Sequence, residues 1–120
     1  EDPLFRVQIA RLREGTTIEP EDWVSIADDA AQEDRPVWSS DGTLVYYTSY
    51  RDGFRCIWAQ RLHPNTKIPS GEPQPIQHFH SARLSMRNVG YGLLEIGVTQ
   101  GNIVFNLGEL TGNIWLARVR

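Results

Sequence analysis

The chain has 120 residues and a formal net charge of −3, and 40% of its residues are apolar and 10% aromatic, including four Trp. This is enough apolar side chain for one domain with a modest core, and too much for a disordered chain. The acidic balance argues against a nucleic-acid-binding surface, which needs clustered Lys and Arg, and no apolar run approaches the length of a membrane-spanning helix.

The N-terminal part of the chain predicts two short strands separated by a loop. Alternation of apolar and polar residues predicts a strand over residues 4–12 and another over residues 23–27. Residues 14–20 contain Gly and Pro and are typical of a turn or loop. Residues 28–34 are acidic and polar, so we expect a solvated connection there.

A four-stranded unit follows, with a tight turn predicted after its first strand and another after its second. The turns Asp41-Gly42 and Asp52-Gly53 suit this role because Gly accepts positive φ without steric cost and Asp bonds back to its own backbone. The four strands are predicted over residues 36–39, 43–50, 54–62 and 74–80. After an irregular crossing over residues 81–92, three more strands are predicted over residues 93–99, 102–107 and 113–119.

The same strand pair occurs twice in the chain. Residues 41–53 align with residues 100–112 without a gap, and each copy leads into an Ile-Trp pair, Ile57-Trp58 and Ile114-Trp115. The N-terminal segment 7–12 aligns with the segments that begin at Ile57 and Ile114. Repetition with a period of roughly 50 to 60 residues indicates an architecture in which each unit buries its apolar face against its neighbours.

We therefore predict an all-β chain of antiparallel, four-stranded β-propeller blades, with about two and a half blades present. Residues 1–34 are expected to be the end of one blade, residues 35–80 a complete blade, and residues 81–120 most of a third. Trp38, Trp58 and Trp115 occupy strand positions of these repeats and are expected to pack between sheets.

Residues 36–53 carry a likeness to a known family. The run at residues 36–42 (Pro-Val-Trp-Ser-Ser-Asp-Gly), the hydrophobic strand after it and the Arg-Asp-Gly at residues 51–53 resemble a blade of the TolB-like, WD40-like propellers. Ser40 stands in place of the Pro of that motif, and in the second copy Gly97 stands where the first has Trp38. The resemblance implies a bacterial scaffold for protein or ligand contacts and, by analogy with TolB, a periplasmic or extracytoplasmic location.

The number of blades raises a question of closure. Propellers close with about four to eight blades, and closure removes the exposed edges of the sheets. Either this chain is the C-terminal part of a larger propeller, or several copies assemble into a ring. We expect a fragment, because Glu1 begins in the middle of a blade and no segment resembles a polar capping repeat.

His78 and His80 are the first candidate site residues. They flank Phe79 and are expected on the same face of a strand, where two histidines can bind zinc or manganese. A metal site needs further ligands at the same point, and the third histidine, His63, lies in a predicted loop. We therefore predict no metal site, and interpret the two histidines as a polar strand end that faces the propeller channel or solvent.

Arg83 and Arg87 extend the histidines into a basic segment. The candidate residues for binding a ligand or partner are thus His78, His80, Arg83 and Arg87. Such a segment at a junction between blades suits an anion or an acidic peptide. The alternative is a solvated crossing loop with Leu84 and Met86 packed beneath it.

Two other features have structural interpretations. Cys56 lies in an apolar strand pattern and is expected to be a small buried side chain rather than a reactive thiol. Asp28, Asp29, Glu33 and Asp34 form an acidic cluster in the sequence. It lacks the regular alternation and central Gly of a calcium-binding loop, so we interpret it as part of a solvated connection.

The sequence contains no nucleophile elbow, no zinc-protease helix motif and no phosphate-binding Gly loop. We predict a non-catalytic scaffold without a cofactor, which acts through a protein partner or through self-association that completes the propeller. The alternative is the propeller of an enzyme. It would be either similar to metal-dependent polysaccharide lyases, using His78 and His80, or a gate for a peptidase domain.

Overall fold

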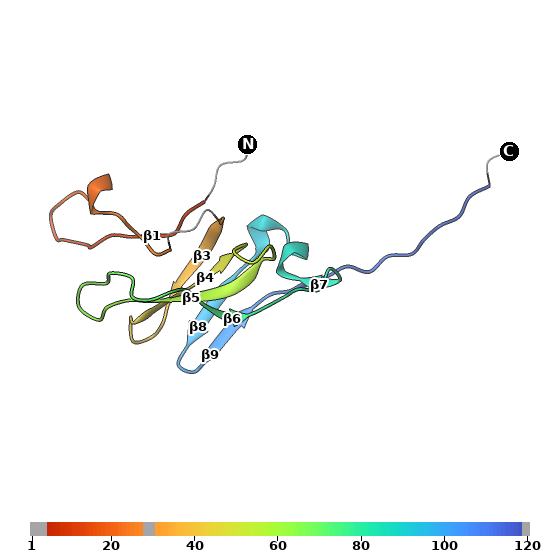
Figure 1. Cartoon of the computed structure of the whole chain (residues 1–120). Coiled ribbons are helices and arrows are strands. Elements are labelled where there is room, and N and C mark those ends of the chain that lie inside the picture. Colours follow the sequence, from red (N-terminus) through yellow and green to blue (C-terminus); the bar gives the residue numbers. More distant parts are fainter. Residues whose placement is uncertain (1–4, 28–30, 119–120) are drawn as a thin grey trace.

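The computed structural model describes residues 5–27 and 31–118, which form antiparallel β-sheets joined by loops (Figure 1). These two ranges contain no α-helix but three short 3-10 helices, and no helix in them is long and apolar enough to cross a membrane. The 3-10 helices are η1 (Pro20–Asp22), η2 (Met86–Asn88) and η3 (Tyr91–Leu93). The strands are β1 (Gln8–Ile9), β2 (Val24–Ser25), β3 (Glu33–Trp38), β4 (Leu44–Ser49), β5 (Cys56–Arg61), β6 (Gln74–Gln77), β7 (Leu84–Ser85), β8 (Ile96–Thr99), β9 (Asn102–Phe105) and β10 (Gly108–Glu109). The prediction of an all-β, antiparallel chain is confirmed.

The predicted four-stranded unit forms one sheet in the order β3-β4-β5-β6, with every neighbouring pair antiparallel. β4 and β5 pair along their whole length. The turns between the first three strands contain Gly42 and Gly53, whose φ angles of +69° and +86° are the left-handed conformation that glycine adopts without strain. Asp41 Oδ1 accepts hydrogen bonds from the Ser39 hydroxyl and the Thr43 backbone N–H, at 2.7 and 3.0 Å, which closes the first turn.

Apolar cores lie on both sides of the central sheet because successive residues of β5 point to opposite faces. The core toward the β1–β2 hairpin consists of Val7, Ile26, Val45, Tyr47, Cys56, Trp58 and Leu62. The core toward the β8–β9 hairpin consists of Ile57, Phe79, Met86 and Leu94, with Val89, Ile96, Ile103, Phe105 and Leu107 packed against them. The central sheet is therefore packed between two hairpins, and Trp58 lies between sheets as expected.

The outer hairpins are shorter than the sequence predicted. β1 and β2 pair over two residues each, within the strands predicted at 4–12 and 23–27, and residue 4 lies outside the described residues. β8 and β9 pair over four residues each, within the strands predicted at 93–99 and 102–107. Two-stranded pairs have few ladder hydrogen bonds, so their outer residues are released into loops.

The acidic stretch at residues 28–34 is not entirely a solvated connection, and this prediction was wrong for its last two residues. Glu33 and Asp34 begin β3 and are only 1% and 9% exposed. Asp34 pairs with Arg55 and accepts a hydrogen bond from the Thr48 hydroxyl, while Glu33 accepts one from the Val7 backbone N–H. Carboxylates are buried only when they are paired, and here their partners are distant in sequence. The other two members of the predicted cluster, Asp28 and Asp29, lie outside the described residues.

The crossing over residues 81–92 is largely irregular, as predicted, but it includes β7, which pairs with β10. Asn88 donates from Nδ2 to the carbonyl oxygens of Arg83 and Gly108, at 3.0 and 3.2 Å. A Cβ at Gly108 would lie 2.5 Å from the Asn88 backbone, so only glycine permits this approach. The β7–β10 pairing directs the chain away from the β8–β9 hairpin after Phe105.

The strand predicted at residues 113–119 does not form, and this prediction was wrong. Residues 110–118 are extended, belong to no sheet, and run out from the molecule in Figure 1; residue 119 lies outside the described part. Ile114 and Trp115 are 101% and 88% exposed, so Trp115 does not pack between sheets. In the first copy the turn is closed by Asp52, which accepts a hydrogen bond from the Phe54 backbone N–H; the second copy has Thr111 there, a weaker turn former.

The described chain is therefore open in shape. Its Cα radius of gyration is 18.1 Å and its extents are 72 × 35 × 26 Å, whereas a compact domain of this length has a radius near 14 Å (roughly). Trp38, the third predicted packing residue, is 45% exposed, with the Lys67 ammonium 6.0 Å from its ring centroid. Much apolar surface at the outer ends is left uncovered.

Candidate metal centre

Four potential ligand side chains converge at one end of the central sheet. Asp52 lies in the β4–β5 turn, and Cys56 is the first residue of β5. His78 and His80 follow directly after β6, which pairs with β5 so that Gln77 lies opposite Ile57. The backbone N–H of Phe79 donates to Cys56 Sγ at 3.4 Å, which places the two histidines beside the turn.

The ligand atoms form a tight cluster. Asp52 Oδ2 lies 2.7 Å from His78 Nδ1 and 2.8 Å from His80 Nε2, and the two ring nitrogens are 3.1 Å apart. With Cys56 Sγ included, all four ligand atoms lie within 4.8 Å of one another. No other cluster of three or more His, Cys, Asp or Glu side chains with this geometry occurs in residues 5–27 and 31–118.

Aromatic contacts hold the two imidazole rings in place. The Phe54 ring stacks on His80, with centroids 4.4 Å apart and planes inclined by 22°. The Trp58 ring meets His78 at 5.7 Å in an edge-on contact. His78 and His80 are 43% and 45% exposed, whereas Cys56 is fully buried, so the cluster opens to solvent on the histidine side.

The charges of the cluster depend on burial and on its own hydrogen bonds. For Asp52, burial is the largest influence and would raise the pKa, but hydrogen bonds from His80 and Phe54 together with the charge of His80 outweigh it and lower the pKa. Burial raises the pKa of the Cys56 thiol, the Phe79 N–H lowers it, and the negative charge of Asp52 raises it again. Asp52 is thus ionised at neutral pH, whereas Cys56 keeps its proton unless a cation lies beside it.

This set of side chains is suited to a transition metal. Thiolate, imidazole and carboxylate are the ligands of zinc in proteins, and a single sulfur with two nitrogens excludes calcium and magnesium, which take oxygen ligands. The sequence singled out the histidines, but gave Asp52 a role only in the turn and Cys56 only in the core. Both of those roles are present: Asp52 Oδ1 binds the Phe54 N–H, and Cys56 is 0% exposed. What the sequence did not indicate is that they lie beside the histidines.

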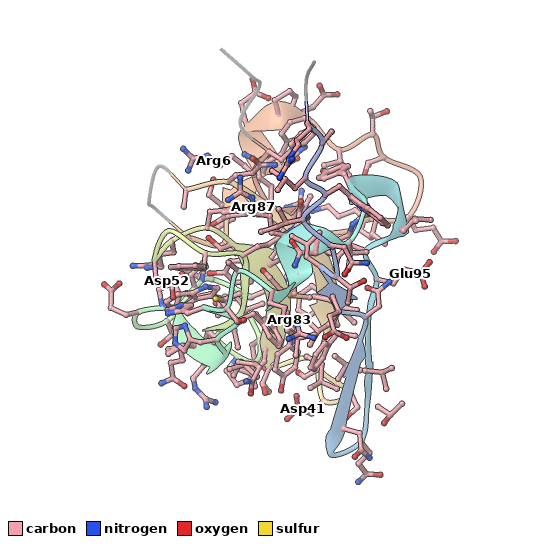
Figure 2. The ribbon with its side chains drawn as sticks, turned by 90° about the vertical axis from the view of Figure 1, so that its right-hand side faces the viewer. Arg6, Asp41, Asp52, Arg83, Arg87 and Glu95 are labelled. Carbon is pink, nitrogen blue, oxygen red and sulfur yellow. The ribbon has the colours of Figure 1, made fainter. Side chains whose placement is uncertain are left out.

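Arg83 and Arg87 make their contacts elsewhere. Arg83 pairs with Glu109 across β7 and β10, with Nη2 and Oε1 2.9 Å apart, and both side chains are more than half exposed. Arg87 lies in η2, where its backbone N–H donates to Ser85 Oγ at 3.1 Å. Figure 2 shows Asp52 to one side of both arginines. The expected loop packing is present for Met86, which is fully buried, and not for Leu84, which is 47% exposed.

A separate cavity of about 520 Å³ lies between β2 and the loop that joins β5 to β6. Its charged lining includes Arg6, Arg51 and Glu72. Arg51 Nη2 and Glu72 Oε2 are paired at 3.2 Å, and Glu72 is 89% exposed. This cavity contains none of the metal-ligating side chains.

The function of the chain has to be inferred from this chemistry and from the packing of the sheets. Asp52, Cys56, His78 and His80 form the cluster of ligand side chains, and the outer hairpins carry the uncovered apolar surface. Comparison with protein-family models, with curated proteins and with solved structures finds no match for this chain.

Proposed function

We propose that this chain is a non-catalytic scaffold of stacked β-sheets of the TolB-like propeller type, which binds a protein partner or further copies of the same unit. The incomplete covering of the outer hairpins carries the proposal. The central sheet has an apolar core on both sides, but the β8–β9 hairpin has one only on its inner side. Val104 on β9 is 64% exposed, while its neighbours Ile103 and Phe105 pack inward.

The opposite end of the stack has the same character. Both residues of β2 are exposed, and Trp23 and Leu12 beside the β1–β2 hairpin are 50% and 85% exposed. In repeat folds each sheet relies on its neighbours to cover its apolar face. Large exposed apolar side chains at both ends of the molecule are candidates for an interaction surface.

The extended segment 110–118 supports the same function. It repeats the Ile-Trp pattern of β5 but has no strand beside it, and Leu116 is 96% exposed. Apart from Leu110, whose N–H donates to the Arg83 carbonyl oxygen, the segment belongs to no sheet, so an extended apolar run of this kind is ready to add to the edge of another sheet. We expect this segment to become a strand when a neighbouring sheet is supplied.

Light scattering after size-exclusion chromatography tests the proposal. We expect the 13.7 kDa chain to form a defined assembly. Val104→Asp places a charge on the contact face and is expected to lower the mass of that assembly. Asn102→Asp is the matched control, because Asn102 is an exposed polar residue two positions away on the same face of β9. A monomer that binds no hydrophobic dye contradicts the proposal, because the apolar surfaces are then covered within a single chain.

A metal-dependent lyase is the competing function. The observation in its favour is that His78 and His80 lie side by side next to Asp52. A catalytic metal keeps a coordination position open for water or substrate. Here four side chains already surround the same point, which fills a tetrahedral shell. The arrangement therefore supports a structural metal more than a catalytic one.

A further inference from the structure

We propose that Asp52, Cys56, His78 and His80 bind one zinc ion, which fastens the β4–β5 turn to the end of the edge strand β6. The ligands are Asp52 Oδ2, Cys56 Sγ, His78 Nδ1 and His80 Nε2, all within 4.8 Å of one another.

Protons alone do not account for the contacts in this cluster. Asp52 Oδ2, His78 Nδ1 and His80 Nε2 form a triangle with edges of 2.7, 2.8 and 3.1 Å, each short enough for a hydrogen bond. A ring nitrogen carries either one proton or one lone pair in its plane, so it makes one good hydrogen bond and not two. At least one edge of the triangle must then bring two like groups together. A cation inside the cluster receives all the lone pairs at once.

The spacing of the atoms suits zinc after small adjustments. With Zn–N and Zn–O distances of about 2.0–2.1 Å and Zn–S of about 2.3 Å, ligand atoms on a tetrahedral ion lie about 3.3–3.6 Å apart. The triangle of nitrogen and oxygen atoms is slightly tighter than this, and Cys56 Sγ is slightly farther away. Shifts of about 1 Å at the ligand atoms would bring these separations to the tetrahedral values.

The identity of the ion follows from the ligands. One thiolate, two imidazoles and a carboxylate are zinc ligands, and four of them in a tetrahedral arrangement fit zinc, with cobalt as a spectroscopic substitute. Four protein ligands close the shell, so the ion is structural. Phe54 and Trp58 fix the imidazole rings from outside, at 4.4 and 5.7 Å between centroids.

The position of the site explains what the ion does. β6 is an edge strand of four residues, all of them exposed, and the β5–β6 register shifts between Ile57 and Trp58. Apolar burial therefore contributes little to holding β6. The chain leaves the central sheet after Gln77, and the Phe79 ring packs against the Phe105 ring of the β8–β9 hairpin, with centroids 5.2 Å apart. Zinc at this point fixes the edge strand and the crossing to the β8–β9 hairpin together.

Titration of the whole purified chain, freed of metal by a chelator, with Zn²⁺ and Co²⁺ tests the proposal. We expect one ion per chain, and with Co²⁺ an intense visible spectrum of tetrahedral type together with a thiolate-to-cobalt charge-transfer band. Cys56→Ser removes that band, and His80→Ala lowers the affinity by more than about 100-fold, since loss of supporting groups alone costs 10–100-fold. His63→Ala is the matched control, because His63 lies in the β5–β6 loop and binds the backbone N–H groups of Asn65 and Thr66.

Two results overturn the proposal. One is a folded wild-type chain that gives no thiolate–cobalt band, and the other is binding that His80→Ala and His63→Ala weaken equally. His80 is 45% exposed, so its replacement tests the site even where Cys56→Ser, at a buried position, fails to fold. Azide added to the cobalt form leaves the spectrum unchanged if four protein ligands close the shell; a shift makes the site an open one. The metal titration uses the chain alone, so its outcome is independent of whether the chain assembles with partners.

Discussion

The two Ile-Trp pairs of this chain lie in opposite environments. Ile57 and Trp58 lie in β5, between β4 and β6, and are 0% and 7% exposed. Ile114 and Trp115 have the same sequence context, yet they lie in an extended segment at full exposure. The difference lies in their neighbours: β5 has a strand on each side and a sheet packed on each face, whereas residues 111–118 have neither. A repeated pattern becomes a strand only where an edge and a covering face are present.

The ion pair in the central sheet, Arg55–Asp34, is buried, whereas the pair between β7 and β10, Arg83–Glu109, is exposed. We expect the largest change in stability from breaking the buried pair. Replacing Arg55 by Met leaves the Asp34 carboxylate buried without its partner, because the two side chains are 4% and 9% exposed. We expect a loss of about 3–5 kcal/mol in the free energy of unfolding, measured by urea denaturation. Arg83→Ala removes the exposed pair with Glu109 and should cost less than about 1 kcal/mol. Equal losses for the two variants would contradict the buried pairing of Asp34.

The repeated isoleucines give a second test. Ile57→Ala opens a cavity in the core toward the β8–β9 hairpin and is expected to cost about 2–5 kcal/mol. Ile114→Ala makes the same chemical change on a side chain in contact with water, so the stability of the isolated chain should not change. If an assembly forms, Ile114→Ala should weaken it instead. Destabilisation of the single chain by Ile114→Ala would mean that residues 110–118 pack in solution.

Replacing the corresponding glycines of the two repeats by Ala should give a smaller difference in stability than the isoleucine variants do. Gly53 has φ of +86°, a conformation that costs other residues about 1–2 kcal/mol, and it has open space around its Cα. Gly53→Ala is therefore expected to destabilise the central sheet by that amount. Gly112, its counterpart, shows no such φ, and Gly112→Ala should be neutral. Both are measured by thermal unfolding with a chelator present, so that metal binding at neighbouring Asp52 does not contribute.

The parts of the fold that were predicted correctly have local signals. Asp-Gly turns and runs of aliphatic and aromatic residues mark β4 and β5, and their pairing needs only a short hairpin. The segment after Gly112 has a similar apolar run, but strand formation there depends on a partner strand that no local pattern supplies. The burial of Asp34 likewise depends on Arg55, which is 21 residues away.

The candidate site was predicted in part, for the same reason. His78 and His80 stand out in sequence because they are two residues apart. Asp52 and Cys56 join them only through the β5–β6 pairing, whose register shift cannot be read from residue periodicity. Arg83 and Arg87 are near the histidines in sequence, yet the 3-10 helix η2 and the β7–β10 pair direct them to other contacts.

The smallest effect concerns the first turn of each repeat, where Asp41 corresponds to Gln100. The Ser39 hydroxyl, the Thr43 backbone N–H and the Thr43 hydroxyl all donate to Asp41, and they lower its pKa from 3.8 to about 2. Because the folded pKa is lower than the unfolded one, the turn is stabilised by this carboxylate above pH 3.8, and the contribution is lost as the pH falls toward about 2. An NMR titration should give a midpoint for the Asp41 carboxyl near 2, with the Thr43 amide shifting in parallel, and Asp41→Asn should abolish that shift. A midpoint at 3.8 would mean that these hydrogen bonds do not persist in solution, and that the first turn is no better fixed than the Gln100 turn of the second repeat.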